Sequence, residues 1–162
     1  MSELLKLKKN ALILHPSGSE SFGTIPDMPN FDLPGGEIYL RMGEHFRDNS
    51  GFGVRHIWDA HKADLAKFGC LAIEQVARHI ASMIVNRASI YCEFRAMRGN
   101  HRLAVMKTPA GSLILEPRQE RRGFGYYVVT WYPKRSPSGT LVGQVVRVPA
   151  RALAPTSGSS QV

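Results

Sequence analysis

Two histidines stand eleven positions apart around a short glycine-rich stretch, in GEHFRDNSGFGVRH (residues 43–56). Cleaving RNA without a metal requires that the attacking 2′-hydroxyl lose a proton and that the leaving 5′-oxygen gain one. Because the pKa of an unperturbed imidazole is about 6.5, one histidine can act as base and another as acid at neutral pH. His45 and His56 are therefore candidates for an acid–base pair.

Other groups in the sequence can stabilise the charge that develops on phosphoryl oxygens during such a reaction. Gly51 and Gly53 let the backbone approach a phosphate closely and offer N–H donors. Much later, the run GYYVVTWYP contains Thr130 and Tyr132, whose hydroxyl groups can bind and orient a substrate. We expect all four residues to lie beside the histidine pair.

A fixed cation would serve the same purpose, and the sequence offers several. Arg95, Lys107 and Lys134 each lie in or beside a segment with strand character, and Arg55 directly precedes His56. The residue pattern alone leaves the choice among Arg95, Lys107 and Lys134 open. We expect Arg55, Arg95 and Lys134 to contact the substrate.

The elements that would position these residues begin with a short strand at residues 37–43, and a short helix follows in HIWDAHKADLAKFG. In CLAIEQVARHIASMIV, apolar residues recur at the spacing of a helix, which predicts one amphipathic helix. We expect its apolar face to belong to the core and His79, next to Arg78, to lie on its solvent-facing side.

After residue 86 the pattern changes to extended runs rich in β-branched and aromatic residues, separated by turn residues. Short links between successive strands favour an antiparallel meander. The sequence therefore predicts an α+β fold, with N-terminal helices packed on a C-terminal antiparallel sheet of four to five strands. We expect an extended arm at residues 1–36, one folded domain at residues 37–150 and a flexible tail at residues 151–162.

Charge is distributed unevenly along the chain. Residues 1–85 hold nine Lys and Arg against ten Asp and Glu, whereas residues 86–162 hold twelve against three. The chain as a whole has a formal charge of +8, and its basic C-terminal half favours a polyanionic partner such as nucleic acid.

The apolar content of 43% is typical of a globular protein. No apolar run approaches the length of about 20 residues that a membrane span needs. Cys70 and Cys92 lie among apolar neighbours, which indicates buried free thiols, and we expect the protein to act in the cytoplasm.

The sequence resembles the barnase–EndoU–colicin–RelE superfamily of metal-independent RNases. The resemblance lies in the order of its motifs, which is GEH, then GFGVRHI, then a helix, and then a meander that contains TWYP. The sequence is most similar to the phage-encoded, polymorphic-toxin and EndoU-like branches. The resemblance covers about residues 37–135. It implies RNA cleavage to a 2′,3′-cyclic phosphate by His45 and His56, with Lys107 as the lysine on the sheet and Thr130 and Tyr132 binding substrate.

The same resemblance implies a toxin or effector that acts on tRNA or another cellular RNA and is delivered into a target cell or carried by a phage. It also implies an acidic immunity protein as a second partner. We expect no cofactor and no metal site, because no Cys, Asp or Glu lies at a customary ligand spacing among His45, His56 and His61.

Two other functions remain open. The first is an RNA- or DNA-binding module, or a virion component, that uses the basic sheet without catalysis and stacks bases on its aromatic residues. The candidate stacking residues are Tyr91, Phe94, Tyr126, Tyr127 and Trp131. The second is an ADP-ribosyltransferase, which we rank last because the Glu-x-Glu signature of that chemistry is absent.

Overall fold

The structure is a computed structural model that describes residues 3–47, 50–94, 102–107, 111–133 and 139–147. Its helices are α1 (Gly53–Ala66) and α2 (Val76–Met83), with short 3₁₀ helices at Glu3–Lys6, Pro29–Phe31 and Ile73–Gln75. Its strands are β1 (Leu12–Ile13), β2 (Thr24–Ile25), β3 (Gly36–Arg41), β4 (Glu44–Arg47), β5 (Ser50–Phe52), β6 (Ser89–Cys92), β7 (Leu103–Lys107), β8 (Gly111–Glu120), β9 (Gly123–Tyr132) and β10 (Thr140–Gln144).

The main sheet is mixed and, within the described ranges, has eight strands. Its order is β1-β3-β9-β8-β7-β6-β10, and β2 also pairs with β3. Strands β6 to β9 form the antiparallel meander that the sequence predicts. Within this sheet, the sequence did not predict the parallel pairing of β3 with β9, the return of β10 to β6, or the pairing of β1 and β2 with β3. The α+β class is confirmed, but the expectation of a purely antiparallel sheet of four to five strands was wrong.

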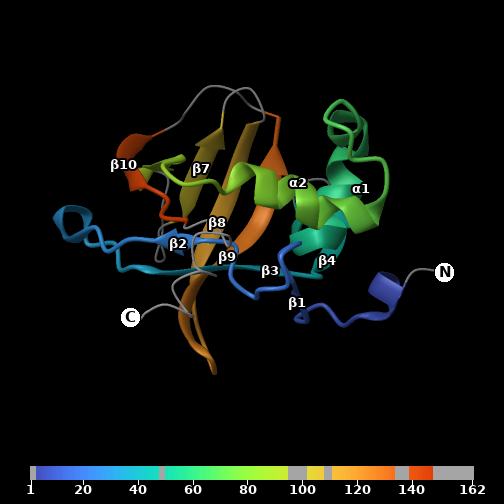
Figure 1. Ribbon diagram of the computed structural model, residues 1–162, viewed down its shortest axis with the longest axis horizontal. Helices are drawn as coiled ribbons and strands as arrows, with labels where there is room; N and C mark the ends of the chain where they lie inside the picture. Colours follow the sequence, from blue (N-terminus) through green and yellow to red (C-terminus); the bar gives the residue numbers. More distant parts are fainter. Residues whose placement is uncertain (1–2, 48–49, 95–101, 108–110, 134–138, 148–162) are drawn as a thin grey trace, which may run out of the picture.

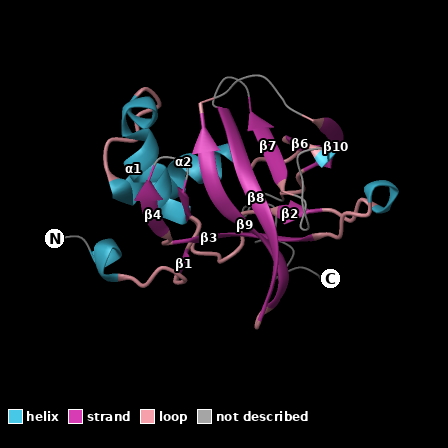
Figure 2. Cartoon of the chain, turned by 180° about the vertical axis from the view of Figure 1, so that it is seen from behind, coloured by secondary structure: helices cyan, strands magenta, loops and turns pink. Residues whose placement is uncertain are grey.

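The helices are in the middle of the chain, between β5 and β6, and not at its N-terminus as expected. Helix α2 crosses one face of the sheet and packs on β7 and β8, while α1 lies beside the β4–β5 hairpin and β9 (Figure 1). The view from behind shows β8 and β9 with no helix in front of them (Figure 2). The sheet therefore has one covered face and one face on which polar side chains can gather.

The core lies between the helices and the covered face of the sheet. Along β8, Leu113 and Leu115 are fully buried and face the helices. Since side chains alternate along a strand, Glu116, Arg118 and Glu120 project from the opposite face. The same alternation therefore builds the core and the polar surface from one strand.

Helix α2 is shorter than the sequence predicts. The expected single helix divides into the 3₁₀ turn Ile73–Gln75 and α2, and its buried stripe consists of Val76, His79, Ile80 and Met83. The prediction that His79 faces solvent was wrong, because only 7% of this residue is exposed.

The segment expected as an extended arm, residues 1–36, contributes β1 and β2, both paired with β3. Phe22 and Ile25 are fully buried in the common core. The hydroxyl of Tyr126 donates a hydrogen bond of 2.6 Å to the carbonyl of Pro34, and burial raises the pKa of this tyrosine to about 12. Most of this segment is thus integrated with the sheet. The expected tail, residues 151–162, lies outside the described residues.

Candidate active site

The two histidines of the opening motif lie in direct contact. His45 is in β4, opposite Gly51 in β5, and His56 is in the first turn of α1. Their Nδ1 atoms are 3.0 Å apart, and the ring centroids are 5.1 Å apart. The sequence between them is the hairpin and the helix start that fold one ring back onto the other.

A contact between two Nδ1 atoms constrains the protons that the pair can hold. One nitrogen must donate and the other must accept, so at most one of the two Nδ1 atoms carries a hydrogen while the contact persists. His56 is buried, with 4% exposed, whereas His45 is only partly buried. His45 is the member of the pair that solvent can reach.

Gly51 has a specific packing role in this arrangement. Its φ angle is +143°, and a Cβ atom added there would lie 2.7 Å from His56 Nδ1. A side chain at this position would therefore press into the contact between the rings. The glycine allows β5 to pass directly over His56. Gly53, with φ +78°, starts α1 where the chain turns out of the hairpin.

The two hydroxyl residues expected beside the histidines lie at the end of β9. Thr130 is 4% exposed, and its Oγ1 has no hydrogen-bond partner among the described residues. Tyr132 is 38% exposed, and its ring meets the ring of His61 edge-on at 5.5 Å. The structure thus brings His45, His56 and Gly51 together, while Tyr132 accompanies His61.

The expected cations have different positions. Arg55 donates from Nη1 to the carbonyl of Gly43 at 2.9 Å, and from Nη2 to the carbonyls of Leu5 and Leu7 at 3.1 and 2.6 Å. It therefore ties the N-terminal segment to the residues just before β4. Lys107 ends β7, opposite Gly111 of β8. Arg95 and Lys134 lie outside the described residues.

Sequence reasoning missed the polar side chains on the open face of the sheet. Two adjoining hollows of about 470 and 340 Å³ share Asn10 and Arg41 in their walls. Six basic and two acidic residues line them: Lys9, Arg41, Arg102, Arg118, Arg121 and Arg122, with Glu116 and Glu120. We call the two hollows together the arginine hollow.

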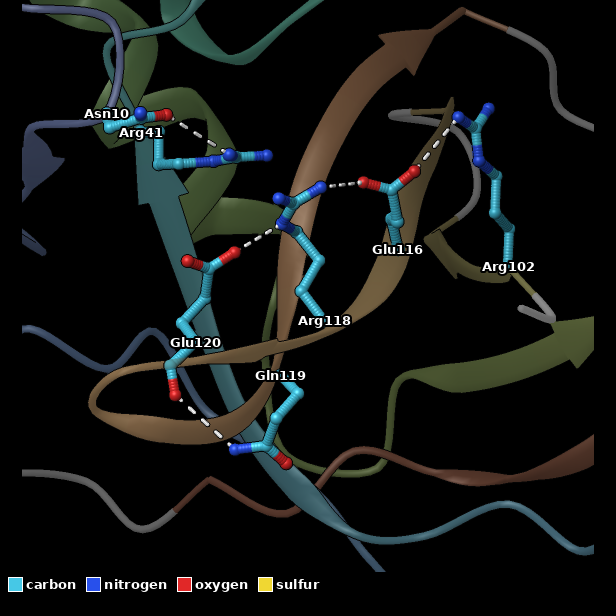
Figure 3. A network of polar contacts seen from close by, with 7 residues as sticks. All are labelled: Asn10, Arg41, Arg102, Glu116, Arg118, Gln119 and Glu120. Carbon is cyan, nitrogen blue, oxygen red and sulfur yellow. Dashed lines mark hydrogen bonds and ion pairs between the residues drawn. The ribbon is translucent and has the colours of Figure 1, made fainter. Parts of the chain in front are cut away.

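Arg118 is at the centre of a network of ion pairs in the arginine hollow (Figure 3). Its Nε donates to Glu120 at 2.6 Å and its Nη1 to Glu116 at 3.2 Å. Glu116 also accepts from Arg102 at 3.2 Å. A period-two pattern, Glu116-x-Arg118-x-Glu120, was the sequence signal that these residues share one face of a strand.

Arg41 is the most buried cation of this group, with 7% of the residue exposed. Its guanidinium lies over the rings of Phe52 and Tyr127, at 4.1 and 4.8 Å from their centroids. Its Nη1 reaches Asn10 Oδ1 at 3.4 Å, and its Nε has no hydrogen-bond partner among the described residues. Burial, followed by the nearby charge of Arg118, lowers the pKa of Arg41 from its ordinary value.

The arginine hollow adjoins the histidine pair. Gly51, which touches His56, lines the smaller hollow together with Phe52 and Val129. Strand β5 also packs against β9 next to these residues. Gly51 is therefore common to the surroundings of the histidine pair and to the wall of the arginine hollow.

A second group of aromatic and histidine side chains packs around Trp131. The ring of His79 meets Trp131 edge-on at 4.8 Å and lies 5.6 Å from Phe68. Burial lowers the pKa of His79 to about 4. Trp131, Tyr126 and Tyr127 are at most 2% exposed. The expectation that these three rings could stack bases was therefore wrong, because no base can reach them.

Among the described residues, no three or more His, Cys, Asp and Glu side chains gather in a way that could hold a metal ion. Within the same ranges, no helix combines the length and the apolar character needed to cross a membrane. Comparisons of the chain with protein-family models, with curated proteins and with solved structures gave no significant match.

Proposed function

We propose that this protein is a metal-independent endoribonuclease in which His45 and His56 form the acid–base unit. The observation that carries the proposal is the 3.0 Å contact between the two Nδ1 atoms, beside a hollow whose lining includes Lys9, Arg41, Arg102 and Arg118. Histidine is the side chain that most often serves as general acid or base in enzymes. The neighbouring cations suit a substrate with a phosphate backbone.

In this mechanism the more exposed ring, His45, exchanges protons with the substrate. The pair accepts the proton of the 2′-hydroxyl as its oxygen attacks phosphorus, and it returns a proton to the 5′-oxygen as the P–O bond breaks. The products are a 2′,3′-cyclic phosphate and a free 5′-hydroxyl. One proton is taken and one is returned, so the pair ends in the state in which it began.

His56 supports His45 in two ways. Its buried ring fixes the orientation of His45 through the Nδ1 contact, and it provides a second nitrogen across which the proton can be shared. We propose that Lys107 and Tyr132 act on the substrate from the ends of β7 and β9, whereas the buried Thr130 does not contact it directly. The cations of the arginine hollow balance the charge on the phosphoryl oxygens.

The test is to incubate purified protein with total RNA in EDTA and to analyse the ends of the fragments. Cleavage with 2′,3′-cyclic phosphate and 5′-hydroxyl ends is the expected result. Cleavage that persists undiminished in a His45→Gln, His56→Gln double variant would overturn the assignment of the pair.

One observation favours a second function. His56 is almost completely buried, and so is the hydroxyl of Thr130, which limits how many of the expected catalytic groups meet a substrate directly. The alternative is a nucleic-acid-binding module that uses the arginine hollow without cleaving. Salt-sensitive binding of RNA with no products after prolonged incubation in the same assay would favour it.

A further inference from the structure

Arg41 is in an unusual situation for a buried cation. A charge removed from water is costly unless an opposite charge or several hydrogen bonds compensate it. Among the described residues, Arg41 has no ion-pair partner within 4.0 Å. Its direct contacts are one long hydrogen bond to Asn10 and the faces of two aromatic rings, and the carboxylates of Glu116 and Glu120 act on it from a greater distance. The guanidinium still has an Nε donor without an acceptor. The side chain is thus held in place but not neutralised.

A second guanidinium faces the same space. Figure 3 shows Arg118 extending from β8 toward the region where Arg41 lies, with Glu116 and Glu120 on either side of Arg118. The positive charge of Arg118 acts to lower the pKa of Arg41, while the carboxylates of Glu116 and Glu120 act to raise it, so they offset part of the repulsion between the two cations. An anion between the two guanidinium groups would relieve the repulsion that remains.

The shape of the guanidinium group indicates which anion fits. Its planar array of N–H donors binds tetrahedral oxyanions and carboxylates through two parallel hydrogen bonds. The carboxylates of Glu116 and Glu120 already occupy donors of Arg118, which shows that its position suits an oxyanion. Room for a larger ligand exists, because the two hollows that share Arg41 measure about 470 and 340 Å³.

We propose that Arg41 and Arg118 form a phosphate-binding subsite that holds a backbone phosphate of a single-stranded nucleic acid next to the histidine pair. Asn10 supplies a further polar group at its edge. The identity of the strand as RNA rests on the proposed function, whereas the phosphate contact itself does not. When the subsite is empty, the carboxylates of Glu116 and Glu120 form ion pairs with the guanidinium of Arg118, and they compete with the incoming phosphate for its N–H donors.

The experiment measures binding of a single-stranded 2′-deoxyoligonucleotide of ten nucleotides to the full chain by fluorescence anisotropy. This probe lacks the 2′-hydroxyl and cannot be cut by transesterification, so binding is observed apart from cleavage. Inorganic phosphate is added as a competitor in one arm, and chloride of equal ionic strength in another. If phosphate displaces the probe where chloride does not, the subsite recognises the phosphate group itself.

Three variants alter the subsite. Arg118→Gln removes a partly exposed side chain and should weaken binding about tenfold or more. It should also reduce the dependence of log K on log salt concentration by about 0.7 for the lost phosphate contact. Arg41→Lys keeps the charge but not the planar donors and should weaken binding by a similar factor. Glu116→Gln releases Arg118 and Arg102 and should tighten binding about threefold.

Lys67→Gln is the matched control, because it also removes one positive charge, but from an exposed side chain at the end of α1. It should leave binding unchanged. Thermal melting shows whether each variant is folded. If Arg41→Lys does not fold, the opposite effects of Arg118→Gln and Glu116→Gln still decide the question. Binding by folded Arg118→Gln that equals the wild type, or weaker binding by Glu116→Gln, would overturn the proposal.

Failure of this subsite can be distinguished from failure of the proposed function. If the variants shift binding as expected but wild-type protein leaves RNA uncut, the nuclease function is wrong and the phosphate subsite stands. If the wild type cuts RNA and Arg118→Gln binds and cuts equally well, the subsite is wrong and the nuclease function stands.

Discussion

The protein contains two histidine sites that differ in almost every physical respect. At the first, His45 and His56 meet through their Nδ1 atoms at 3.0 Å, next to a hollow rich in arginine. At the second, His79 packs edge-on against Trp131, and its Nε2 has no hydrogen-bond partner among the described residues. The first site joins two imidazoles next to a group of cations, whereas the second holds a single ring inside the core. Spacing in the sequence does not separate these roles, but the chemistry of the surroundings does.

The largest effect is expected at the first site. His45→Gln or His56→Gln should lower the rate of RNA cleavage by about 10² to 10⁴, because general acid–base help is lost. The double variant should be scarcely slower than either single variant, since the two rings act as one unit. The rates are measured on one RNA in EDTA.

His79→Leu is the control for this prediction. Its cleavage rate should stay close to that of the wild type, because His79 lies in the core and not at the pair. Losses that simply multiply in the double variant would show that the two rings of the pair act independently.

The second site should dominate the response of stability to acid. The pKa of His79 is about 4 in the folded protein against 6.5 for the ordinary side chain, so the unfolded chain binds more protons between these values. Stability from this group is therefore complete above pH 6.5 and is lost as the pH falls toward 4, by at most about 3 kcal/mol. Urea unfolding at pH 7 and pH 4 measures the loss.

His79→Leu removes this titration while leaving the carboxylates of the protein unchanged. The variant should therefore lose less stability than the wild type between the two pH values. An identical loss in both proteins would mean that His79 is not held neutral in the core.

The smallest of these effects concerns the packing that holds the pair together. Gly51→Ala should destabilise the protein by about 1–2 kcal/mol more than Gly123→Ala, because a Cβ at residue 51 presses on the carbonyl oxygen of Glu44 and on the imidazole of His56. Both glycines have positive φ angles, but nothing lies within 4 Å of a Cβ built at Gly123. Thermal or urea unfolding compares the two variants. Equal destabilisation would show that backbone strain, and not these close contacts, decides the cost.

Local patterns predicted much of the fold. The β-branched and aromatic runs and the turn residues between them gave the strands β6 to β9 in their correct antiparallel order. The parallel pairing of β3 with β9 joins residues almost ninety positions apart, such as Ile38 and Tyr126, and no local pattern in one sequence encodes such a contact. The return of β10 to β6 was missed for the same reason.

Single residues at the sites were harder to predict than the strands. His79 lies at helical spacing from Val76 and Met83, so its place on the buried stripe was visible in the sequence, but its polarity favoured a solvent-facing position. It is buried because the large ring of Trp131 offers it an edge-on contact. Arg41 was read only as part of a strand, since the rings that flank it come from Phe52 and Tyr127, distant in the sequence.

The most direct test of the central claim uses an RNA with one mapped cleavage position and a matched RNA that carries a deoxynucleotide at that position. Wild-type protein in EDTA should cut the first RNA to a 2′,3′-cyclic phosphate and leave the second intact at that site, and the His45→Gln, His56→Gln variant should cut neither. Cleavage of the deoxy-substituted position, or full cleavage by the double variant, would contradict the claim that these two imidazoles move the proton of the attacking 2′-hydroxyl.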